Sequence, residues 1–100
     1  MAGATSSPIW RQVPGAAKFS FEEISGPNPY AGGGFLADSS LFSGFSRVDV
    51  FFPLCTNSLQ WEAAPDVANN KIKLFDRSTK AESGAVDQSS VKIYCLVIGR

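Results

Sequence analysis

Five short runs of this chain alternate apolar and polar residues with a period of two, the pattern of half-buried β-strands. The runs are KFSFEEI (18–24), SRVDVFF (46–52), SLQWEA (58–63), NKIKLFD (70–76) and SVKIYCLVIG (90–99). Pro-Asp and Asn-Asn turn signals between the third and fourth runs predict a hairpin. The second half of the last run is apolar on both faces, which is typical of a central strand. The chain is therefore predicted to be all-β, a small antiparallel β-sandwich or barrel.

The phase of each alternation predicts which side chains face the core. For Trp61, which is in phase with Leu59, a core position is favoured over a surface position. The only helix candidate, residues 36–45, contains three serines and one aspartate, so a turn or two is expected at most. The residues expected to point mostly inward are Phe19, Phe21, Val48, Val50, Leu59, Trp61, Ile72, Leu74, Ile93, Cys95 and Val97.

The chain has 100 residues, enough for one domain with a small core. Residues 1–16 are rich in Ala, Ser, Gly and Pro and are predicted to form an extended N-terminal arm; residues 17–100 form the β domain. A small apolar cluster with Ile9, Trp10 and Val13 lies within the arm. Two interpretations stay open for Trp10: it packs on its own domain, or it docks on a neighbouring subunit.

The composition argues against most catalytic chemistry. The chain has no histidine, which removes the commonest general base and the commonest metal ligand. Glu22 and Glu23 are adjacent on a predicted strand, so they point to opposite faces and cannot act together as an acid/base pair. No catalytic residue, cofactor or metal site is therefore expected.

The balance of charges and the spacing of the cysteines indicate which partners and which cellular compartment to expect. Lys plus Arg and Asp plus Glu number nine each, and the basic residues are scattered, so nucleic-acid binding is not expected. The first ten residues lack the positive start and the apolar run of a signal peptide, so export is not expected. No apolar run of the sequence approaches the ~20 residues of a membrane span. Cys55 and Cys95 lack CxxC spacing; a disulfide between them is conceivable, but assembly in a cytoplasm predicts free thiols.

Three glycines in YAGGGF (30–35) invite comparison with a phosphate-binding loop. Such a loop joins a strand to a helix N-terminus, where backbone N–H groups face the anion. Here the glycines come after the turn-rich SGPNP, no GK[ST] or GxGxxG spacing is present, and the helix after them is doubtful. The glycines are interpreted as a corner between strands.

The order of segments resembles that of the small proteins encoded beside the major capsid gene in many tailed bacteriophages. The matching pieces are the glycine turn at 32–34, Val48-Asp49, the hairpin strand at 70–74 and the closing strand at 91–99. The resemblance covers about residues 17–100 and departs from the family at Phe35, where the family has an acidic residue. It implies a β-sandwich virion component that decorates or cements the capsid, with no catalytic residues to carry over.

The expected function is that of a non-enzymatic decoration protein that binds and stabilises the outer capsid lattice. Its expected partners are the major capsid protein and further copies of itself at capsid symmetry or quasi-symmetry positions, on virions assembled in the host cytoplasm. The alternative is a host- or carbohydrate-binding module of a phage fibre or tail, with Trp61 or Tyr30 stacking on a sugar. The candidate partner-binding residues are Ile9, Trp10, Arg11, Val13, Tyr30 and Phe35.

Overall fold

The computed structural model describes residues 3–12 and 17–100, with the backbone alone at residues 10–12. Its strands form two antiparallel sheets, so the all-β prediction is confirmed. All five predicted strands are present. Two strands were not predicted: one at the edge of the larger sheet (Thr5–Gln12) and one of two residues (Phe35–Leu36). The elements are β1 (Thr5–Gln12), β2 (Lys18–Ser25), β3 (Phe35–Leu36), β4 (Val48–Thr56), β5 (Trp61–Asp66), the 3₁₀ turn η1 (Val67–Asn69), β6 (Lys71–Asp76) and β7 (Lys92–Gly99).

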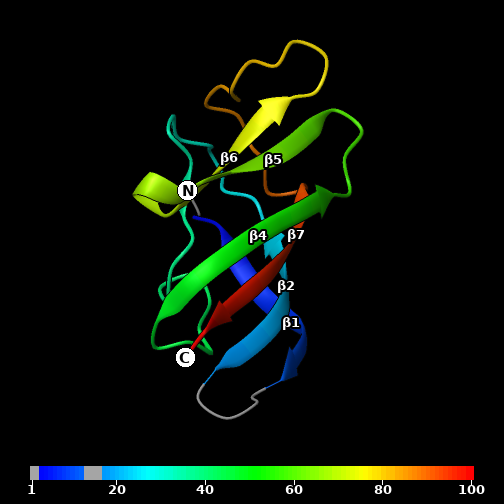
Figure 1. Ribbon diagram of the computed structural model, residues 1–100. Coiled ribbons are helices and arrows are strands. Elements are labelled where there is room, and N and C mark those ends of the chain that lie inside the picture. The colour runs from blue at the N-terminus through cyan, green and yellow to red at the C-terminus, as the bar shows by residue number, and fades with distance from the viewer. Residues whose placement is uncertain (1–2, 13–16) are drawn as a thin grey trace.

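The larger sheet has the strand order β1-β2-β7-β4, and the smaller one β3-β6-β5. Figure 1 shows the larger sheet crossing the lower half of the molecule, with β5 and β6 above it. The C-terminal strand β7 is central, paired with β2 on one side and β4 on the other. This matches the expectation from its two apolar faces.

The predicted hairpin is formed by β5 and β6, which pair from Trp61↔Asp76 to Asp66↔Lys71. The connection is η1 followed by Asn70, whose φ of 54° lies in the left-handed region that asparagine tolerates. Asp76 ends β6 by accepting hydrogen bonds from Ser78 and from the Thr79 amide. These bonds, with that from the Ser78 side chain the largest cause, lower the pKa of Asp76 to about 2.

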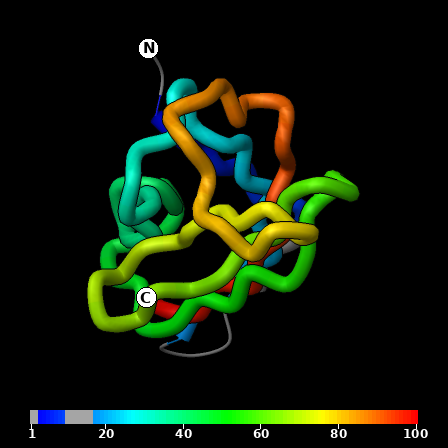
Figure 2. Tube along the Cα trace, turned by 90° about the horizontal axis from the view of Figure 1, so that it is seen from above, coloured from blue at the N-terminus to red at the C-terminus, as the bar shows by residue number. Residues whose placement is uncertain are grey.

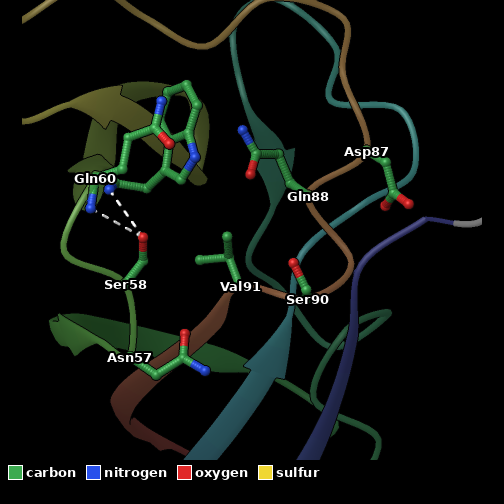
Figure 3. A pocket seen from close by; sticks show the side chains of 8 residues that line it. Asn57, Ser58, Gln60, Asp87, Gln88, Ser90 and Val91 are labelled. Atoms are coloured by element: carbon green, nitrogen blue, oxygen red, sulfur yellow. Dashed lines mark hydrogen bonds between the residues drawn. The ribbon is translucent and has the colours of Figure 1, made fainter.

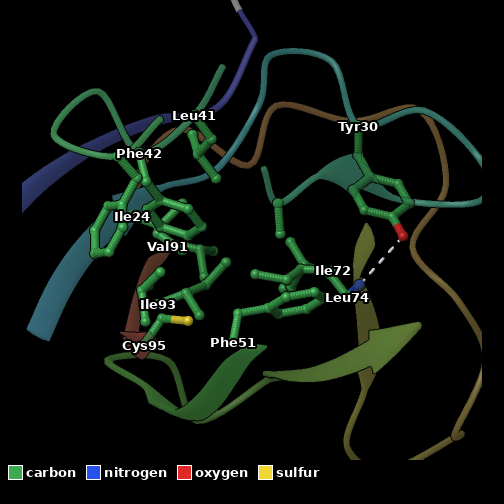
Figure 4. Packing of buried hydrophobic residues seen from close by; sticks show 13 residues of the cluster. Ile24, Tyr30, Leu41, Phe42, Phe51, Ile72, Leu74, Val91, Ile93 and Cys95 are labelled. Carbon is green, nitrogen blue, oxygen red and sulfur yellow. Dashed lines mark hydrogen bonds between the residues drawn. The ribbon is translucent and has the colours of Figure 1, made fainter. Parts of the chain in front are cut away.

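The core lies between the two sheets and is completed by the segment that connects β3 to β4. Figure 4 shows Phe51 of β4 directed toward Ile72 and Leu74 of β6, with Phe42 of the connecting segment beside Ile24. Phe42 and Phe45 meet edge to face, with ring centroids 6.5 Å apart. The buried apolar residues are Ile24, Tyr30, Ala37, Leu41, Phe42, Phe45, Phe51, Ile72, Leu74, Val91, Ile93, Cys95 and Val97.

The segment after β2 lies beside the segment before β7, as Figure 2 shows for the cyan and orange traces. Backbone hydrogen bonds join them, including Tyr30 N to Val86 O and Gln88 N to Pro27 O. The glycine corner closes against β6: at Gly34, φ is +91° and an added Cβ would lie 2.3 Å from the carbonyl oxygen of Ile72. The strand β3 begins directly after the glycines, so the loop does not have the strand-to-helix context of a phosphate site.

Four of the predicted inward orientations are wrong, and the register of the large sheet explains three of them. Phe19 and Phe21 pair with Ile98 and Leu96, so they share the face of β7 opposite to the buried residues. A β-bulge between Val48 and Val50 shifts the alternation of β4, which places Val50 on that same outer face while Val48 packs against the core.

Leu59 is the fourth error: it lies before β5 in the connection from β4 and is 97% exposed. Ile72, Leu74, Ile93, Cys95 and Val97 are buried as predicted, and Trp61 is half-buried against the core. The alternation in SLQWEA suggested a strand that already includes Leu59, but β5 begins two residues later, at Trp61.

On β2, the positions that face inward are Ser20, Glu22 and Ile24. The carboxylate of Glu22 is buried, and it accepts hydrogen bonds from the hydroxyl groups of Ser6 on β1 and of Ser20. Hydrogen bonding of this kind is what allows a carboxylate to be buried.

The segment expected to be an arm contributes to the sheet. Residues Thr5–Gln12 form β1, which pairs with β2 from Thr5↔Ser25 to Gln12↔Phe19. The expected boundary at residue 16 falls among residues 13–16, outside the described part of the chain. The weak helix candidate at 36–45 forms turns, with Asp38 O accepting from the amides of Leu41 and Phe42.

Candidate binding face

The side of the four-stranded sheet opposite to the core is apolar over three adjacent strands. Antiparallel partners point to the same face of a sheet, so the register defines rows of side chains across β2, β7 and β4. The rows are Phe19–Ile98–Val50 and Phe21–Leu96–Phe52, and Tyr94 lies next to Leu96 on the same side of β7. We call these seven residues the outer face.

The outer face is most open to solvent along β4. Val50 is 41% and Phe52 45% exposed, and the neighbouring Leu54, in a second β-bulge, is 60% exposed. The members on β2 and β7 are half-buried. Phe21 and Tyr94 stack with centroids 6.3 Å apart, which gives this side of the face a fixed aromatic surface.

Charged groups lie at the margins of the outer face. At one end, Lys92 donates to the hydroxyl group of Ser25 at 2.8 Å, and Glu23 lies opposite Tyr94. At the β4 edge, Arg47 and Asp49 form an exposed ion pair of 2.8 Å. An apolar centre with polar margins is the usual composition of a protein-binding surface.

The size of the face bears on the strength of binding. The seven residues occupy two positions on β2, two on β4 and three on β7. With strands about 4.8 Å apart and about 6.8 Å of strand for each position, they cover roughly 230 Å². This is a small patch, well below the ~800 Å² per partner of a standard stable interface. A single copy would therefore bind weakly through this face alone, and several copies acting together would bind more strongly.

The candidate partner-binding residues of the N-terminal segment lie on or beyond the edge strand β1. Ile9 lies at the β-bulge between Pro8 and Trp10 and is 52% exposed. The backbones of Trp10 and Arg11 pair with Phe21 and Ser20, and Val13 lies outside the described residues. A role for these four residues in docking stays a prediction.

Tyr30 is not available at the surface. It is 1% exposed, its hydroxyl group donates to Glu82 Oε2 at 2.6 Å, and it accepts from the Leu74 amide at 3.2 Å. Burial is the main cause that raises the pKa of Tyr30 well above its ordinary value. The expectation that Tyr30 contacts a partner or a sugar is therefore wrong, because its ring is part of the core that joins the glycine corner to β6.

Glu82 links Tyr30 to the glycine corner by also accepting from the Gly33 amide at 2.8 Å. The hydrogen bond from Tyr30, followed by that from Gly33, lowers the pKa of Glu82. Phe35, the other aromatic flank of the glycines, pairs with Ile72 in β3 and is half-buried against the core. Neither Tyr30 nor Phe35 belongs to the outer face.

Sequence reasoning missed Phe52 and Leu54 as surface candidates. The available signal was the run VFFPL (50–54), which is apolar without alternation and contains a proline. A run of this kind on a strand requires either burial on both faces or an exposed apolar face. Pro53 lies between two residues of such a face and marks β4 as an edge strand.

The two cysteines lie on opposite sides of the large sheet and are free, as predicted. Cys95 is fully buried in the core, and burial raises its pKa to about 12; Cys55 is exposed. Among the described residues, no cluster of three or more Cys, Asp or Glu side chains could hold a metal ion. In the same part of the chain, no helix is long and apolar enough to cross a membrane.

Comparisons with protein-family models, with curated protein sequences and with solved structures found no match to this chain. The fold and the outer face thus define a class only: a small, all-β, sandwich-like protein with an exposed apolar sheet face.

Proposed function

We propose that this chain is a capsid decoration protein of a tailed bacteriophage. It attaches to the outer surface of the assembled lattice of the major capsid protein and stabilises that lattice. The observation that carries the proposal is the outer face, an apolar surface with charged margins on the four-stranded sheet. The resemblance of residues 17–100 to proteins encoded beside major capsid genes supports the same class of partner.

The mechanism is binding without chemistry. A protein that binds the assembled lattice but not its free subunits stabilises the lattice by mass action. The small area of the outer face favours a polyvalent arrangement, in which further copies at capsid symmetry positions each contribute a weak contact. The proposal also includes homo-oligomers of the free protein, which light scattering would detect.

The test uses particles assembled from the major capsid protein of the same genome. Phe52→Lys places a charge on β4, the most exposed strand of the outer face, and Leu59→Lys places the same charge at a fully exposed apolar residue outside it. We expect Phe52→Lys to reduce occupancy of the particles at least about tenfold, because a charge desolvated at the contact costs well over 1.4 kcal/mol, the equivalent of a tenfold change. Leu59→Lys should bind as the unmodified protein does.

Melting temperatures of both variants control for folding. Unchanged occupancy of a folded Phe52→Lys variant would show that the outer face is not the capsid contact. Failure of the unmodified protein to bind particles at all would overturn the decoration function itself.

A further inference from the structure

A recess lies between the β4–β5 connection and the segment before β7, away from the outer face. Its cavity volume is about 340 Å³, which is within the range of small-molecule sites. Figure 3 shows Ser58 and Gln60 on one side of it and Gln88 and Ser90 on the other. The lining is polar and also includes Trp61.

Gln88 is the best-defined group of the recess. It is 2% exposed, and its Nε2 donates to Ser83 Oγ at 2.9 Å, which sets the orientation of the carboxamide. The Gln88 amide donates to Pro27 O, and Val91 N donates to Gln88 O, so the backbone is fixed on both sides. Among the described residues, no donor reaches Gln88 Oε1, and Figure 3 shows this oxygen directed into the recess. A nearly buried acceptor is thus held ready for a ligand donor.

The opposite wall offers donors. Ser58 Oγ accepts from the amides of Gln60 at 3.1 Å and Trp61 at 3.2 Å, so its own O–H is left to donate. Asn57 Oδ1 accepts from the Lys92 amide at 2.9 Å, which orients its Nδ2 donors. A ligand between these walls must donate on one side and accept on the other, and hydroxyl groups do both.

The charged groups that line the recess indicate which ligands it can bind. Among the described residues that line it, Asp87 is the single charged group, and one of its oxygens is already bound by the Ser89 amide and hydroxyl groups. The same lining holds no lysine or arginine, so it offers nothing to neutralise an anion. Trp61 also lines the recess, but the surface of the recess is almost entirely polar, so the ligand is held by polar groups.

We propose that this recess binds a neutral saccharide, with a single pyranose ring as the recognised unit. Gln88 Oε1 accepts from one ring hydroxyl, and Ser58 and Asn57 donate to others. None of these residues belongs to the outer face, so a capsid contact and a saccharide site can operate on the same copy.

The test is titration of the isotope-labelled full chain with the methyl glycosides of glucose, galactose and mannose and with N-acetylglucosamine, followed by NMR. We expect at least one of these probes to give saturable shifts confined to residues 57–61 and 87–91, including the side-chain amide signals of Asn57 and Gln88. Glycerol, as a small polyol without a ring, should give no comparable shifts.

Ser90→Phe fills the recess, and Ser39→Phe is its matched control, since both serines are exposed and neither side chain makes a hydrogen bond within the described part of the chain. Ser90→Phe should weaken binding at least tenfold, and Ser39→Phe should leave it unchanged. Gln88→Met, which keeps the shape but removes the acceptor, should also weaken binding, and its amide spectrum reports whether the fold is kept.

The inference is overturned if none of the four saccharides shifts these signals, if glycerol reproduces the shifts with equal affinity, or if folded Ser90→Phe binds as the unmodified protein does. These outcomes are independent of particle binding, so failure of the saccharide site and failure of the decoration function can be told apart.

Discussion

At the scale of single residues, the glycine corner shows how the close approach of β6 requires a glycine in the segment beside it. Gly33 and Gly34 both have positive φ, but only Gly34 lies against the β6 backbone, with the carbonyl of Ile72 where a Cβ would be. Gly33 instead gives its amide to Glu82. The corner therefore joins the segment after β2 to β6 through backbone contacts that a side chain would prevent.

Gly34→Ala should lower the free energy of unfolding by about 2 kcal/mol or more, since a strained backbone costs roughly 1–3 kcal/mol and the contact with Ile72 adds to it. Gly32→Ala is the matched control, because nothing lies within 4 Å of its added Cβ and its φ is not positive. That variant should range from no change to a stabilisation of about 1 kcal/mol. Urea denaturation measures both, and equal losses would contradict the close contact at Gly34.

At the scale of elements, β4 decides where the core ends and the outer face begins. Its β-bulge between Val48 and Val50 reverses the alternation, so that Phe51 faces Ile72 and Leu74 while Phe52 lies in a row with Leu96. Phe51 is 6% exposed and Phe52 45% exposed. Two adjacent and identical side chains thus have different roles.

Phe51→Ala should lower the free energy of unfolding by about 3–5 kcal/mol, the usual loss for a buried phenylalanine. Phe52→Ala should cost about half of that or less, since the loss scales with the apolar area that was buried. Chemical denaturation of the two variants under identical conditions is the measurement. A larger loss for Phe52→Ala would mean that the alternation of β4 is the one inferred from sequence.

At the scale of the whole molecule, the two thiols report on global opening. Cys95 lies on the central strand at the middle of the core, and its burial both blocks reagents and raises its pKa to about 12. Cys55 is exposed on β4. A domain of this size has an unfolding free energy of about 5–15 kcal/mol, so openings that expose the core are rare.

Alkylation without reductant should therefore add one label to the native protein and two to the denatured protein, as counted by mass spectrometry. Cys55→Ser should take no label when native and one when denatured. Two labels on the native chain would contradict the buried position of Cys95. A linked, unlabelled pair would contradict the prediction of free thiols.

The period-two alternation determined the fold class, the five main strands, the β5–β6 hairpin and the central position of β7. These could be predicted from the sequence because a half-buried strand must alternate and a strand covered on both sides cannot. The sequence also favoured a corner over a phosphate site at the glycines, and the structure places the strand β3 directly after them.

Only the tertiary structure decided which face of β2 and β4 points inward, and with it the candidate site. Phe19 and Phe21 alternate with Ser20 and Glu22, and either set can face a core if the other finds suitable neighbours. Pairing with β7 gave the phenylalanines Ile98 and Leu96, and it gave Glu22 the hydroxyl groups of Ser6 and Ser20. Register and β-bulges depend on contacts between segments far apart in the chain, so the alternation within one strand does not contain them.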